Sequence, residues 1–65
     1  MEGISSRESE VLDLLGERLT NAEIGARLFI SEETVKWYLK NIFGTLGVGN
    51  RTHALIKARE MGLLA

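Results

Sequence analysis

The 65-residue sequence contains no cysteine and no proline, and only one histidine, His53. Without cysteine the chain can form neither disulfide bonds nor a thiolate nucleophile, and a lone histidine with no clustered carboxylate does not make a usual zinc site. We therefore expect no metal and no cofactor. Apolar residues are spread at helical spacing rather than in a run of about 18, which excludes a membrane span, and the start lacks a signal-peptide pattern. We expect a cytoplasmic protein that has no membrane partner.

The residue groups that carry most enzyme chemistry are also missing. The sequence offers no serine with a plausible histidine base, no glycine-rich loop for a phosphate and no paired carboxylates in an apolar setting. The acidic residues Glu10, Asp13 and Glu17 fall on the solvent side of an apolar stripe instead. We therefore expect that the protein is not an enzyme.

Length and charge limit the architecture and the partner. A chain of 65 residues forms one small domain over residues 1–65 and can bury only about 60% of its unfolded surface. The formal net charge of −1 argues by itself against a polyanionic partner, but local fields decide such binding and the charge is unevenly placed. From Glu32 onward the basic residues outnumber the acidic ones. We therefore expect the second half of the chain to face an anion.

Capping signals predict where the first two helices begin. Ser5 with Glu8, and Thr20 with Glu23, have capping-box spacing. In this arrangement a hydroxyl accepts the N–H group three residues on, and the glutamate reaches back to the cap. Apolar residues at helical spacing follow each box, which predicts an amphipathic helix after each.

Two further N-caps, Ser31 and Asn50, predict two more helices, and Gly47 fits the left-handed position that ends the first of them. Gly62 marks the end of the last helix. The residues expected to face inward in these two helices are Val35, Leu39, Ile42, Phe43 and Leu46, then Ala54, Leu55, Ala58 and Met61. The sequence predicts an all-α fold, a compact domain of four helices over about 6–16, 21–29, 32–46 and 51–62.

The only tryptophan lies opposite the apolar stripe of the third predicted helix. At about 100° per residue, Trp37 points away from Val35 and Leu39 and stands beside Lys40 and Asn41 on the outer face. An aromatic ring among cations and hydrogen-bonding groups is typical of a surface that meets a partner. The alternatives are that the ring packs on a neighbouring loop or is exposed without a function, and that the lysines form a solvated charged face.

A short helix, a tight turn and a longer helix with exposed Thr34, Lys36, Trp37 and Lys40 form the pattern of a helix-turn-helix, whose second helix enters the major groove. From Ile4 to Leu64 the chain resembles the LuxR-type, or FixJ/NarL-type, domains of bacterial transcription regulators. The residues that carry the resemblance are Ser6, Arg7, Glu8, Glu10, Val11, Leu12, Leu19, Thr20, Asn21, Glu23, Ile24, Leu28, Ile30, Ser31, Thr34, Val35, Lys36, Leu39, Ile42, Leu46, Gly47, Val48, Asn50, Arg51, Thr52 and Ala54.

The resemblance implies a central helix-turn-helix that reads double-stranded DNA, a first helix that supports it, and a C-terminal helix that often forms a homodimer. It implies sequence-specific DNA binding as the output domain of a bacterial transcription regulator, with half-sites about 10 bp apart. In such regulators the domain sits at the end of a chain whose other part senses a signal. RNA polymerase is then an expected partner of the full-length protein.

Functional residues carry over by position. Base contacts are expected from Lys36, Trp37 and Lys40, because lysine can donate to guanine and an indole ring can touch a thymine methyl group. Helix N-termini and short polar side chains position a protein on phosphates without reading sequence. The candidates for backbone contacts are Asn21, Arg27, Ser31, Thr34, Tyr38 and Asn41. The alternative for Asn21, Ser31 and Thr34 is that they only cap the helix starts, and the sequence favours both roles equally.

The last predicted helix offers a separate surface. Ile56 and Leu63 are expected to point outward beside Thr52 and Arg59, and we assign these residues to a dimer interface. The alternative is that Ile56 meets the remainder of a longer protein or stays exposed. A second reading of the whole chain is a helical protein-interaction module that anchors its partner with Trp37, Tyr38 and Ile56.

Three departures from the family pattern involve four positions. Tyr38 stands where histidine is commoner, which lengthens the reach of its donor. Arg18 stands where glycine is usual, and a left-handed backbone there would cost roughly 1 kcal/mol. Gly44 and Thr45 stand where many members carry basic residues, so we expect weak DNA binding by an isolated monomer.

Overall fold

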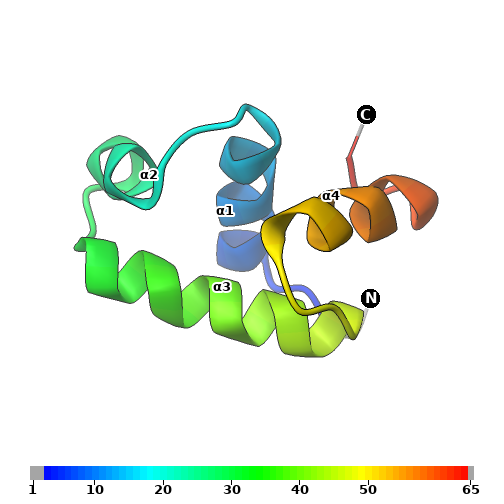
Figure 1. Cartoon of the computed structure of the whole chain (residues 1–65). Helices are drawn as coiled ribbons and strands as arrows, with labels where there is room; N and C mark the ends of the chain where they lie inside the picture. The colour runs from blue at the N-terminus through cyan, green and yellow to red at the C-terminus, as the bar shows by residue number, and fades with distance from the viewer. Residues whose placement is uncertain (1–2, 65) are drawn as a thin grey trace.

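The computed structural model describes residues 3–64, which form four α-helices joined by short turns (Figure 1). The helices are α1 (Ser6–Gly16), α2 (Asn21–Leu28), α3 (Glu32–Leu46) and α4 (Arg51–Glu60). The predicted all-α fold is confirmed, and no strand occurs among the described residues. A helix that crosses a bilayer would need to be longer and more apolar than any helix in this part of the chain.

Every helix begins at a predicted cap. The Glu8 N–H donates to Ser5 Oγ at 3.2 Å, and the Ser5 N–H donates to Glu8 Oε1 at 3.0 Å. The same reciprocal pair joins Thr20 and Glu23, at 3.1 and 2.7 Å. The side chains of the two remaining caps each accept one backbone N–H, which confirms Ser31 for α3 and Asn50 for α4. These bonds satisfy donors that the first turn of a helix leaves without partners.

α3 is the centre of the packing, since it contacts each of the other three helices. In Figure 1, α2 lies near the N-terminal end of α3, and α4 lies near its C-terminal end. The core consists of apolar side chains from all four helices: Val11, Leu12, Leu15, Ile24, Val35, Leu39, Ile42, Leu46, Ala54 and Ala58. With its apolar stripe turned inward, α3 has its opposite face free for contacts outside the domain.

The turns on both sides of α2 contain left-handed residues other than glycine. Arg18, at the position where the family usually has glycine, has φ 66°, and Phe29 has φ 59°. Each conformation costs roughly 1 kcal/mol in a residue with a side chain. Phe29 is 95% exposed, so packing of its ring on the core does not offset this cost.

Gly25 allows the tight turn between α2 and α3. It is buried, and a Cβ added there would lie 2.7 Å from the backbone oxygen of Ile30. That separation is too short for a side chain, because the clash is with backbone rather than with a movable side-chain end. The Ile30 N–H donates to the Gly25 carbonyl at 2.9 Å, so the turn closes directly over this residue.

The end of α4 differs from the prediction at Met61 and Leu63. Because α4 ends at Glu60, these two residues do not continue the helical phase that placed Met61 inward and Leu63 outward. Gly62 is left-handed at φ 75°, and the Leu63 N–H donates to the Ala58 carbonyl at 2.8 Å. This reversal of the chain is typical of a Schellman motif and turns Leu63 against the core. Met61 is instead 49% exposed.

Candidate nucleic-acid interface

The outer face of α3 presents an aromatic ring beside two cations. Trp37 is 59% exposed, and Lys36 and Lys40 are exposed, which confirms that this face points away from the core. The Trp37 ring meets the Tyr38 ring edge to face, with centroids 5.2 Å apart and an interplanar angle of 71°. Tyr38 is half-buried and packs against the core. It therefore gives the exposed indole a fixed neighbour on the domain.

The two lysines of this face differ in their surroundings. Lys36 Nζ lies 3.3 Å from Glu33 Oε1, one turn earlier, and both side chains are more than half exposed. Such a surface pair contributes little and is readily exchanged for another anion. No carboxylate within residues 3–64 lies at ion-pair distance from Lys40. Lys40 is therefore the less neutralised cation of the two.

The start of α3 uses its hydroxyl groups locally. Ser31 Oγ accepts the Thr34 N–H at 3.1 Å and lies 2.9 Å from Thr34 Oγ1. These two residues therefore do take part in capping α3, which was the alternative to a DNA contact. Each hydroxyl still has a free lone pair or proton, so capping and a phosphate contact are compatible. Asn41, about two turns beyond Thr34 on α3, is half-buried.

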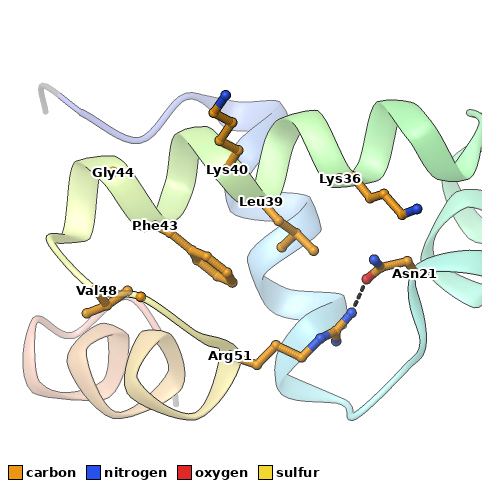
Figure 2. A pocket seen from close by; sticks show the side chains of 9 residues that line it. Asn21, Lys36, Leu39, Lys40, Phe43, Gly44, Val48 and Arg51 are labelled. Atoms are coloured by element: carbon orange, nitrogen blue, oxygen red, sulfur yellow. Dashed lines mark hydrogen bonds between the residues drawn. The ribbon is translucent and has the colours of Figure 1, made fainter.

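Asn21 is tied to the start of α4. Arg51 Nη2 donates to Asn21 Oδ1 (Figure 2). Arg51 Nη1 donates to the Leu19 carbonyl at 3.2 Å. Since a guanidinium has donors only, it must meet the oxygen of the amide, which leaves the Asn21 Nδ2 group as a donor. No role was predicted for Arg51 from the sequence, although it follows the N-cap Asn50 and belongs to the residues that carry the family resemblance.

Arg27 is directed toward α1 rather than toward α3. Its Nη1 lies 3.8 Å from Glu17 Oε1, and both side chains are 57% exposed. A second arginine missed by sequence reasoning, Arg7, donates from Nη2 to the Leu28 carbonyl at 3.0 Å. Arg7 and Arg51 therefore hold the two ends of α2, which forms the predicted DNA-reading unit together with α3.

A groove of about 470 Å³ runs beside the outer face of α3 that carries Lys36 and Lys40, between α3 and the start of α4 (Figure 2). Its apolar side is formed by Leu39, Phe43 and Val48, and its polar side by Asn21 and Arg51. Lys36, Lys40, Gly44 and Gly49 complete the lining. Phe43 was expected to face the core, and it does pack there as a half-buried residue while also lining this groove.

The predicted dimer surface on α4 is only partly formed. Ile56 is 50% exposed, and Thr52 and Arg59 are exposed. Leu63 does not join them, because it packs against the core after the helix has ended. A hollow of about 280 Å³ next to Ile56 is lined by Val48, His53, Ile56, Lys57 and Glu60. The exposed apolar surface is therefore centred on Ile56.

Comparison with known proteins identifies a family. The profile of the family GerE, described as "Bacterial regulatory proteins, luxR family", matches residues 2–58. The transcriptional regulator AlkS of Alcanivorax borkumensis is 46% identical over 61 residues, which cover 94% of this chain and 7% of AlkS. The spore germination protein GerE of Bacillus subtilis is 41% identical over 61 residues, which cover 94% of this chain and 82% of GerE.

The fold matches a solved structure of the same kind. The response regulator ChrA of a heme-sensing two-component system superposes with a TM-score of 0.92 at 46% identity. The match covers 97% of this chain and 31% of ChrA. This chain spans less than a third of the length of AlkS and of relatives such as the regulatory proteins LiaR of Bacillus subtilis and DegU of Brevibacillus brevis. The shared part is therefore the four-helix domain.

Proposed function

Because this chain belongs to the LuxR family of bacterial regulatory proteins, we propose that it binds double-stranded DNA as the DNA-binding part of a transcription regulator. In this proposal α3 lies in the major groove, which admits an α-helix. The observation that carries the proposal is the outer face of α3, where the exposed Trp37 stands beside Lys36 and Lys40. The regulators among the relatives support the same function.

The base contacts are proposed for three residues of α3. Lys40 can donate to guanine O6 or N7. No ion pair has to break first, because no carboxylate within residues 3–64 lies at ion-pair distance from Lys40. Lys36 must exchange its contact with Glu33 for one with DNA, which is a small loss at an exposed site. Trp37, supported by the edge of Tyr38, can pack on a thymine methyl group or on sugar.

The phosphate contacts are proposed around both ends of this face. Asn21 would donate from Nδ2, because its oxygen is occupied by Arg51. Ser31 and Thr34 stand at the N-terminus of α3, where backbone N–H groups and the helix dipole favour an anion. Further candidates are Tyr38 and Asn41 on α3 and Arg27 on α2, although the guanidinium of Arg27 would first have to leave Glu17.

The homodimer contact and the further partners are proposed from the exposed residues of α4 and from the family. We place a homodimer contact on α4 at Thr52, Ile56 and Arg59, supported by the exposure of Ile56. A full-length regulator of this kind would act with RNA polymerase in the cytoplasm. We also propose a non-enzymatic role, since the family consists of regulatory proteins. The protein-interaction module based on Trp37, Tyr38 and Ile56 is not favoured, because the relatives are transcription regulators.

The experiment is a titration of a labelled random-sequence duplex with the purified chain, followed by fluorescence anisotropy at several salt concentrations. DNA binding through phosphates predicts that log K falls linearly with log salt, by about 0.9 for each phosphate neutralised. A Lys57→Ala variant removes one exposed charge outside the α3 face and serves as the control. Absence of duplex binding by the folded chain at low salt would contradict the proposal.

A further inference from the structure

The groove between α3 and α4 joins three proposed DNA contacts, Asn21, Lys36 and Lys40, to an apolar lining that DNA reading does not require. Its volume of about 470 Å³ lies within the range of about 300 to 1,000 Å³ that is usual for small-molecule sites. It is an open depression in the surface rather than an enclosed cavity, so a ligand can enter without movement of a helix. No acidic residue is among the described residues that line it.

The two ends of the groove differ in chemistry (Figure 2). Lys36, Asn21 and Arg51 stand at one end, whereas Phe43 and Val48 stand at the other. Leu39 lies between them as the apolar floor. A ligand that follows this order has an anionic head and an apolar body.

Hydrogen-bond donors remain available at the polar end. Arg51 has five N–H groups and gives bonds to the Leu19 carbonyl and the Asn21 oxygen. The Asn21 amide nitrogen donates as well, and Lys36 has only an exposed pair with Glu33 to exchange. A carboxylate placed here would receive charge-assisted hydrogen bonds. The half-buried ring of Phe43 favours an aromatic body at the other end.

We propose that this groove binds a small aromatic carboxylate and that the bound ligand competes with duplex DNA. The carboxylate lies among Lys36, Asn21 and Arg51, and the ring lies over Leu39 against Phe43 and Val48. Competition follows because Lys36 and Asn21 are also proposed DNA contacts. The ligand site stands on the groove alone, whereas the competition rests on the proposed function.

The experiment uses 2-naphthoate as the probe and records backbone amide shifts of the folded chain by NMR. We expect saturable shifts at Phe43, Gly44 and Val48, with a dissociation constant of about 1 mM. Neutral 2-naphthamide should bind at least threefold more weakly, because it lacks the charge. Lys36→Gln should weaken 2-naphthoate binding about threefold, whereas Lys57→Gln removes an equal charge outside the groove and should have no effect.

The outcomes separate the two parts of the proposal. The site would be overturned if about 10 mM 2-naphthoate, ten times the expected dissociation constant, did not shift the amide signals of the groove residues. It would also be overturned if the Lys36→Gln and Lys57→Gln variants bound 2-naphthoate equally well. Competing 2-naphthoate should raise the apparent dissociation constant for a random duplex by a factor of one plus the ratio of its concentration to its own dissociation constant. Unchanged DNA binding in the presence of bound 2-naphthoate would overturn the competition. If the ligand-free chain does not bind DNA at all, the proposed function fails while the NMR shifts still decide the site.

Discussion

The Arg51 guanidinium, at the start of α4, donates a hydrogen bond to the side-chain oxygen of Asn21, at the start of α2, 30 positions away in the sequence. Among the described residues α2 and α4 do not otherwise pack on each other. The same guanidinium holds the Leu19 carbonyl at 3.2 Å. Arg51 therefore fixes the beginning of α2 relative to the α3–α4 pair, and it sets which atom of Asn21 remains available to a ligand.

Replacement of Arg51 by methionine should destabilise the domain by about 1 to 3 kcal/mol. The substitution keeps an apolar stem but leaves the partly buried Leu19 carbonyl and the Asn21 oxygen without their donor. Urea unfolding followed by circular dichroism measures the change. Lys57→Met on the exposed side of α4 is the control and should change the free energy of unfolding by less than about 0.5 kcal/mol. Equal losses in both variants would remove Arg51 from this role.

Lys40→Ala should reduce discrimination between DNA sequences by about 1 to 3 kcal/mol without unfolding the domain. The reason is that Lys40 stands on the outer face of α3, is exposed, and supports no contact within the core. Competition between a selected duplex and random duplexes measures the discrimination. Lys57→Ala carries the same change of charge on α4 and should lower affinity slightly without altering selectivity. Unchanged selectivity in Lys40→Ala would exclude this side chain from base reading.

Glu23 should make the start of α2 sensitive to acid. Hydrogen bonds from the Thr20 backbone N–H and then its side chain lower the pKa of Glu23 below its ordinary value of 4.5. A carboxylate with a depressed pKa in the folded state stabilises the fold above the unfolded pKa, and this contribution is lost as pH falls through the folded pKa. Stability attributable to Glu23 should therefore be complete at pH 7 and decline below about pH 4.5.

The matched variant is Glu23→Gln, which can keep the capping box but cannot titrate. Urea unfolding at pH 7 and at pH 3 should show a smaller acid-induced loss of stability in the variant than in the original chain. Carboxylates other than Glu23 contribute to both proteins alike, so the difference isolates this residue. Identical pH dependence of the two proteins would show that the cap is indifferent to the charge.

Ile56→Glu should weaken dimer formation and cooperative binding to paired half-sites, while binding to a single half-site stays nearly the same. The side chain is 50% exposed on α4, and a carboxylate there cannot be buried against a second copy without a large desolvation cost. Sedimentation equilibrium and titrations with one and two half-sites measure the two effects. Met61→Glu, at a similarly exposed apolar residue outside the helix, is the control. Dimerisation that is equally strong in both variants would place the contact elsewhere.

Local signals were sufficient to predict most of the fold. Capping boxes at Ser5 and Thr20 and the caps Ser31 and Asn50 involve residues three positions apart, so the sequence contains both partners of each bond. The inward face of α3 follows from helical phase alone, and so does the exposure of Trp37. Only the family resemblance raised a left-handed backbone at Arg18 as a possibility, since nothing about arginine itself favours that conformation.

Features that depend on tertiary structure could not be predicted in the same way. The roles of Arg51 and Arg7 depend on which carbonyl groups the fold brings near them. The requirement for Gly25 comes from the approach of the Ile30 oxygen across the turn. Leu63 and Met61 were misplaced because the helical phase was extended past Glu60, where a left-handed glycine turns the chain. Contacts with DNA stay predictions, because they involve a second molecule.

The most direct test of the central claim is the fluorescence of Trp37, the only tryptophan, during titration with random duplex DNA at low and at high salt. Its ring is exposed on the face of α3 that we place in the major groove. The account predicts quenching or a spectral shift on binding at low salt, with an affinity that falls steeply as salt rises. No change in the emission of the folded chain at any salt concentration would contradict it.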